Sequence, residues 1–179
     1  VLGIEGGGGI IQKDVVPGAT PQPASVYADI VSQLETSGVQ GWSIAIELTG
    51  PEEFYLAKAT TDGTAGEPAR SGGFEKTEIV DPPRNGGRRG AVSAIVLNFT
   101  SGLTLPLWGT ESVLLLQVAT DLPQTEEEKV ATLRFEDGLR GSGQPVRNAI
   151  TVAGGTQTPC NTDHASVNVV FQGVCCGPP

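Results

Sequence analysis

The sequence has no methionine, only one histidine and no long apolar run. Its apolar stretches, such as residues 113–116, are far shorter than the about 18 residues that a membrane-spanning helix needs. With 11 basic and 20 acidic side chains, a net charge of −9 and a pI near 4.5, it has no basic stripe to displace counterions from nucleic acid. The missing methionine predicts a mature chain whose leader has been removed, and therefore a secreted or cell-surface protein.

The residues that carry most enzymatic chemistry are also scarce. In its predicted strand, His164 falls on the face opposite the apolar residues and is therefore expected at the surface. Ser142 lies in a Gly-Ser-Gly turn rather than a nucleophile elbow. The glycine run 6–9 lacks the Gly-Lys-Ser/Thr ending of a phosphate loop. Neighbouring acidic residues at 52–53 and 126–128 are typical of solvated loops. We therefore expect no catalytic site, no cofactor and no metal site.

Calcium is the alternative that stays open, since Asp62, Asp137 and Asp163 all lie in predicted turns, although without EF-hand spacing. The basic segment 84–89 is rich in glycine and is expected to be a solvated loop rather than an anion site.

Three cysteines lie near the C-terminus: Cys160, Cys175 and Cys176. In an exported protein this odd number predicts one disulfide, from Cys160 to either Cys175 or Cys176, and one further thiol that cross-links chains, stays free or belongs to a vicinal pair. Zinc is disfavoured because only His164 is near enough to supplement the thiols.

Abundant glycine (25) and proline (13) indicate many short strands joined by turns. In residues 39–48, Trp42, Ile44, Ile46 and Leu48 alternate with Ser43, Ala45 and Glu47, the period of a half-buried strand. Residues 129–136 alternate in the same way, with Ala131, Leu133 and Phe135 inward. Further strands are expected at 26–34, 54–61, 75–80, 91–99, 113–120, 147–153 and 164–172. The sum predicts an all-β, two-sheet sandwich over residues 24–179.

Residues 1–23 differ from this body. Apolar residues at Val1, Leu2, Ile4, Ile10 and Ile11 flank the glycine run, and a proline-bearing segment follows. We interpret this segment as an arm that forms an added strand, either within its own domain or on a neighbouring molecule, and we favour the neighbour.

Residues 39–46, 59–64, 91–97 and 130–135 resemble the strands of cohesin-like domains. The resemblance covers about residues 26 to 171 and implies a jelly-roll sandwich with a binding or scaffolding role and no chemistry. The sequence differs from cohesins at the place where their first strand enters the sheet, because the glycine-rich arm occupies that place here.

Two functions follow as hypotheses. In the first, the chain is a subunit of an extracellular fibre, a head-to-tail homopolymer in which the arm of one copy enters the sandwich of the next. Removal of residues 1–14 would then leave soluble, less stable monomers. In the second, it is a monomeric cohesin-like module that binds a protein or a glycan, with Trp108 as the exposed platform and Trp42 in the core. Asn98 begins an Asn-Phe-Thr sequon and is the candidate for glycosylation.

Overall fold

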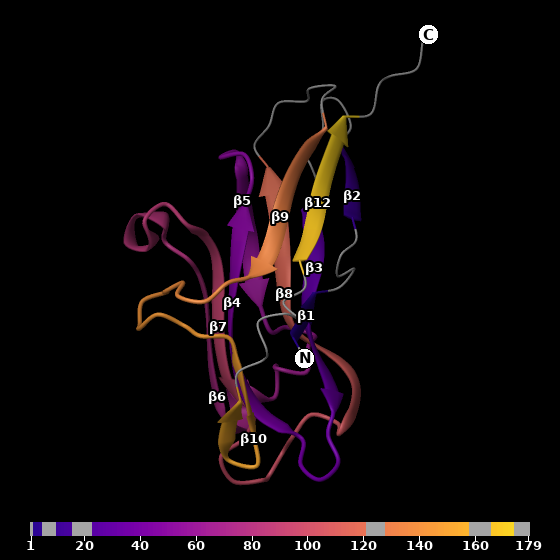
Figure 1. The fold of residues 1–179 in the computed structure, drawn as a ribbon, viewed down its shortest axis with the longest axis vertical. Coiled ribbons are helices and arrows are strands. Elements are labelled where there is room, and N and C mark those ends of the chain that lie inside the picture. Colours follow the sequence, from indigo (N-terminus) through magenta and orange to yellow (C-terminus); the bar gives the residue numbers. More distant parts are fainter. Residues whose placement is uncertain (1, 5–9, 16–22, 121–127, 158–165, 174–179) are drawn as a thin grey trace.

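The computed structural model describes residues 2–4, 10–15, 23–120, 128–157 and 166–173. These residues form two β-sheets packed face to face, with strands that run along the long axis of the molecule (Figure 1). The all-β sandwich expected from the sequence is confirmed, and the described helices are only two short turns in connections.

The smaller sheet has four antiparallel strands in the order β1-β3-β8-β5. Its strands are β1 (Leu2–Ile4), β3 (Ala24–Gln33), β8 (Trp108–Thr120) and β5 (Phe54–Thr60). The long central pair β3–β8 keeps its register over the whole of β3, apart from an irregularity after Ala28. The two short or irregular strands, β1 and β5, lie at the edges.

The larger sheet has eight strands and contains the path β11-β10-β4-β9-β12-β2. Its strands are β2 (Ile10–Val15), β4 (Val39–Thr49), β6 (Phe74–Ile79), β7 (Arg89–Val96), β9 (Lys129–Phe135), β10 (Ala149–Val152), β11 (Gly155–Gln157) and β12 (Ser166–Gly173). One side of β4 pairs with β7, which pairs in turn with β6. The other side of β4 pairs first with β10 and then with β9.

The core lies between the sheets and follows the period of two. On β4, the predicted inward set is buried, and on β9 the inward positions Ala131, Leu133 and Phe135 are each at most 2% exposed. The close approach of β7 to β4 needs a residue without a side chain at Gly90, where an added Cβ would lie 2.0 Å from the Ile46 carbonyl oxygen. The sequence pattern therefore fixes the inner faces of these strands.

The outer face of β4 differs from the expectation. Ala45 and Glu47 were predicted on the polar face of a half-buried strand, but they are 0% and 6% exposed. The connection from β9 to β10 folds over this face, and Leu139 within it packs in a second apolar cluster with Ala45, Val80 and Val92. The strand is buried on both sides because an irregular segment covers it.

The short helices lie in connections that the sequence pattern treated as loops. The helix α1 (Ala69–Gly72) precedes β6, and the 3-10 helix η1 (Pro82–Asn85) joins β6 to β7. The helical signal at residues 125–128 lies outside the described residues.

Candidate interaction site

The N-terminal segment contributes one strand to each sheet. Strand β1 runs antiparallel to β3 and places Leu2 opposite Ile30 and Ile4 opposite Ala28. Strand β2 lies parallel to β12, with Ile10 opposite Asn168 and Ile11 opposite Val169. Every other described strand pair is antiparallel. In the single chain the segment therefore lies in the sheets of its own domain, at one edge of each.

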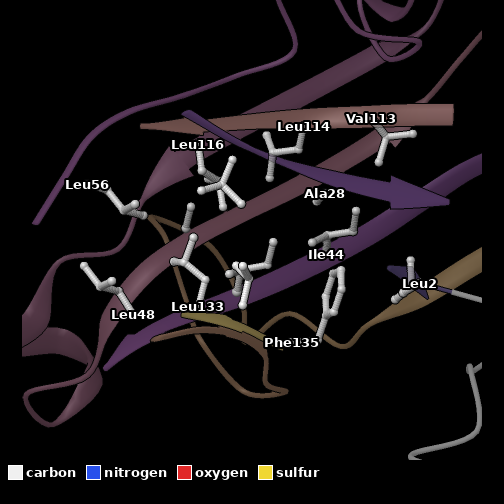
Figure 2. Close-up of a cluster of buried hydrophobic side chains, with 14 of the residues drawn as sticks. Leu2, Ala28, Ile44, Leu48, Leu56, Val113, Leu114, Leu116, Leu133 and Phe135 are labelled. Atoms are coloured by element: carbon white, nitrogen blue, oxygen red, sulfur yellow. The ribbon is translucent and has the colours of Figure 1, made fainter. Parts of the chain in front are cut away.

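Leu2 of this segment enters the core. Its side chain is 1% exposed and belongs to the main apolar cluster. Figure 2 shows Leu2 together with core side chains of both sheets, among them Ala28 from β3 and Ile44 from β4. Burial of a leucine of this kind contributes about 1.5–3 kcal/mol relative to exposure. The edge strand β1 is thus held by packing as well as by its backbone pairing.

The pairing of β2 protects the last strand of the larger sheet. Strand β12 pairs with β9 on one side and with β2 on the other, from Asn168 to Gly173. Without β2, this side of β12 would present a row of backbone N–H and C=O groups, which is a template for another strand. Together, β1 and β2 complete edges that the described body residues leave open.

An ion network fixes the connection that covers β4. Glu47 accepts hydrogen bonds from Arg88 Nε at 2.8 Å and from Arg134 at 2.7 Å. Burial raises the pKa of Glu47, but the hydrogen bonds from the two guanidinium groups outweigh it and hold the pKa below its ordinary value. Arg88 also donates to the backbone carbonyl of Asp137 at 3.3 Å. The Glu47 carboxylate is therefore ionised and structural.

The neighbouring Arg89 is also engaged. Its guanidinium donates to the backbone carbonyls of the turn between β4 and β5, including Gly50 at 2.8 Å and Glu52 at 3.0 Å. The prediction that residues 84–89 form a solvated basic loop is thus wrong for Arg88 and Arg89. Arg89 is the first residue of β7 and Arg88 precedes it. At this position a carboxylate oxygen of Glu47 and backbone carbonyl oxygens lie beside the two guanidinium groups.

A second ion cluster ties α1 to β5 and β6. Arg70 donates to Glu75 at 2.5 Å and also contacts Asp62, which in turn lies 3.2 Å from Lys58. The hydrogen bond from Arg70 lowers the pKa of Asp62 to about 2, with help from Thr60 and Lys58. Asp62 is therefore bound to cations of the chain itself. The described acidic residues form no group of three or more that could hold a metal ion.

The connection from β7 to β8, together with the first residue of β8, carries four exposed large apolar side chains. Phe99 and Trp108 are 69% and 64% exposed, and Leu103 and Leu107 are also exposed. Trp42 is 3% exposed and lies in the core. The predicted difference between the two tryptophans is confirmed. Aromatic side chains on a surface are typical of contact sites for proteins or sugars.

Asn98, the sequon residue, is half-buried where β7 leads into this connection. Its Oδ1 accepts hydrogen bonds from the backbone N–H groups of Thr100 and Ser101, at 2.8 and 2.6 Å. Its amide nitrogen faces Gly72, where an added Cβ would lie only 2.1 Å away. Glycosylation at Asn98 stays a prediction.

The remaining predicted site residues are placed as follows. Val1, Cys160, Asp163, His164, Cys175 and Cys176 lie outside the described residues, so the disulfide stays a prediction. Among the described residues, no helix is long and apolar enough to cross a membrane.

The sequence interpretation missed the segment between β9 and β10. It is held by Asn148, which is 1% exposed, and whose backbone and side-chain amide N–H groups both donate to Asp137 at 2.8 and 2.9 Å. The only sequence signal for this arrangement is Leu139 and Val146, two apolar residues in a glycine-rich stretch.

No protein-family model matches this sequence, and no curated protein matches it. Solved structures do match its fold. The seventh ScaB type I cohesin from Pseudobacteroides cellulosolvens aligns with 99% of this chain and 94% of its own, with a TM-score of 0.50 and 9% identity. A type I cohesin–dockerin complex from Clostridium thermocellum aligns over 97% of this chain and 99% of the matched chain, with a TM-score of 0.50 and 13% identity. Over nearly its whole length, the chain therefore has the fold of a cohesin-like jelly-roll domain.

Proposed function

We propose that this chain is a non-catalytic, extracellular protein-binding module whose partner is a second copy of itself. The N-terminal strands of one molecule complete the sandwich of the next, and repetition builds a fibre. The observation that supports this most directly is the burial of Leu2 in the core from a strand at the sheet edge. The N-terminal segment and the body are thus complementary surfaces.

The complementary surfaces can meet within one molecule or between two. Strand β1 pairs with β3 and strand β2 pairs with β12, and each strand has one described pairing partner. The same register and the same burial of Leu2 arise when the segment comes from a neighbour, which is the principle of domain swapping. In the exchanged arrangement the N-terminal segment belongs to a different molecule, but its strands pair and its side chains pack in the same way.

The geometry of such a contact favours an open chain of molecules. The segment and the edges that receive it are different surfaces, so the contact is heterologous, and a heterologous contact that does not close into a ring extends into a filament. Backbone pairing along two sheet edges, together with a buried side chain, is the mode of strand addition.

The test compares the full chain with a variant that lacks residues 1–15. Light scattering after gel filtration and negative-stain electron microscopy should show concentration-dependent oligomers or fibres for the full chain and monomers for the variant. A peptide of residues 1–15 should bind the variant and raise its melting temperature, and a Leu2→Asp peptide should not. Monomers of the full chain at every concentration would exclude exchange.

A second candidate function rests on the exposed apolar side chains between β7 and β8. The exposed side chains of Phe99, Leu103, Leu107 and Trp108 would support a monomeric module that binds a different protein or a glycan. In that case Trp108→Ala would abolish partner binding, whereas deletion of residues 1–15 would lower stability without changing the oligomeric state.

A further inference from the structure

A cleft opens between the two sheets where β3 ends and faces β10 and β11. Its volume is about 250 Å³. Its walls include aliphatic side chains from Leu34, Val39 and Ile150. They also include three polar residues, Ser32, Gln33 and Gln157. One water molecule takes about 30 Å³ in the liquid, so the cleft has room for a large side chain.

Ser32 is a buried polar residue without a described partner. It is 3% exposed, and its hydroxyl oxygen is fully buried and makes no hydrogen bond with the described residues. Trp42 Nε1 is the other buried side-chain atom of this kind in the described part of the chain. A buried hydroxyl without a partner costs about 1–3 kcal/mol. Ser32 also lines the cleft, so a ligand in the cleft recovers this free energy when the Ser32 hydroxyl turns toward it and forms a hydrogen bond.

The edge of β3 beside the cleft offers backbone groups as well. Among the described residues, strand β1 pairs with β3 from Ala28 to Ile30. Beyond that, the N–H of Leu34 donates to the Leu107 carbonyl of the neighbouring loop at 2.8 Å, on the β8 side. Because successive residues of a strand point their backbone groups to opposite sides, the N–H and C=O of Gln33 face away from β8. No described strand pairs with Gln33 on that side.

We propose that this cleft is a second binding site, and that its ligand is an extended peptide. The peptide adds to the edge of β3 at Gln33 and places one side chain in the cleft, where a hydroxyl group pairs with Ser32 Oγ. The side chain has an apolar body, because Leu34, Val39 and Ile150 contribute aliphatic walls. Tyrosine meets both requirements.

The register of β1 gives the position of this side chain. Leu2 lies opposite Ile30, so an extended strand that continues β1 comes opposite Ser32 at the second position before Leu2. Side chains two apart share a face, so this one points into the sandwich as Leu2 does. The geometry is the same whether β1 belongs to the same molecule or to a neighbour, and the proposal does not rest on strand exchange.

The experiment uses the full chain with Gly-Ser-Tyr joined ahead of Val1 as the probe. Tethering raises the effective concentration, so even a weak site is filled. The matched control carries Gly-Ser-Asp, because a carboxylate resists burial in an aliphatic cleft. We expect exchange of the Gln33 amide hydrogen to be about tenfold slower with the tyrosine extension, as one net hydrogen bond can supply, and a higher melting temperature.

A double-mutant cycle assigns the effect to Ser32. Ser32→Ala removes the hydroxyl and should cancel most of the gain that tyrosine gives over aspartate, whereas Thr132→Ala on the outer face should leave it unchanged. Equal Gln33 exchange and equal melting temperatures for the two extended chains would overturn the proposal. A gain that is insensitive to Ser32→Ala would also overturn it, since it would reflect apolar contact outside the cleft.

Discussion

Leu2 lies opposite Ile30 in the register of β1 and β3, and both side chains are at most 1% exposed. A side chain on a three-residue edge strand is thus buried as deeply as one on a central strand of the sheet. We expect Leu2→Ala to lower the free energy of unfolding by about 2–5 kcal/mol, since it removes buried methyl groups and leaves a cavity. Urea unfolding followed by circular dichroism would measure the loss.

The matched control for this substitution is Leu103→Ala, because Leu103 is 41% exposed. It should cost less than about 1 kcal/mol. Equal small costs for the two substitutions would contradict the burial of Leu2 and, with it, the completion of the sandwich by β1.

Asn148 replaces a missing strand partner on β4. Its Oδ1 accepts the N–H of Ala45 at 2.8 Å, and the Ala45 carbonyl accepts the N–H of Glu136 at 3.0 Å. This is the place where β4 changes partner from β10 to β9. We expect Asn148→Ala to destabilise the fold by about 2–3 kcal/mol, because it leaves a buried N–H of Ala45 unpaired.

Amide hydrogen exchange at Ala45 would show this directly, since its N–H should exchange faster in Asn148→Ala than in the parent. The control is Asn168→Ala, which removes an exposed amide bonded to Thr132 at 2.8 Å and should change stability by less than about 0.5 kcal/mol. Unchanged protection of Ala45 would contradict the role of Asn148.

The inner faces of the sandwich could be predicted from the sequence, and the outer face of β4 could not. In residues 129–135, strict alternation predicts the buried set Ala131, Leu133 and Phe135, because strand geometry alone decides which face a side chain takes. The burial of Ala45 depends instead on Leu139, in an irregular connection whose path no periodicity encodes. Long-range packing decides this face.

The ion pairs of Glu47 could not be predicted from the sequence for a similar reason. Glu47, Arg88 and Arg134 are far apart in the sequence and meet because β4 pairs with β7 on one side and β9 on the other. Their meeting depends on strand order and register, which local patterns do not specify. The pairing of the N-terminal segment is different, since apolar patches around a glycine run predict an added strand from the local sequence alone.

Glu47→Gln tests whether this network is structural. Both arginines are partly exposed, so we expect a loss of about 2 kcal/mol rather than the roughly 3–5 kcal/mol of a fully buried pair. The loss should be visible as a lower midpoint in urea. The control is Lys58→Gln, whose partner Asp62 is half-exposed, and it should cost less than about 1 kcal/mol. If the two variants unfolded at the same urea concentration, Glu47 would have no special role.

Asp62 gives the fold a defined response to acid. Its pKa is lowered from 3.8 to about 2, chiefly by the hydrogen bond from Arg70, so the folded state favours the ionised form. A group whose folded pKa is depressed stabilises the protein above its unfolded pKa, and that contribution is lost as the pH falls. We therefore expect the stability that Asp62 provides to be present above about pH 4 and to vanish as the pH falls through about 2. Asp62→Asn should lower the melting temperature at pH 7 and lower it much less at pH 2, and Glu53→Gln, on an exposed turn, serves as the control. An equal drop for Asp62→Asn at both pH values would show that the side chain acts through packing and hydrogen bonding rather than through its charge.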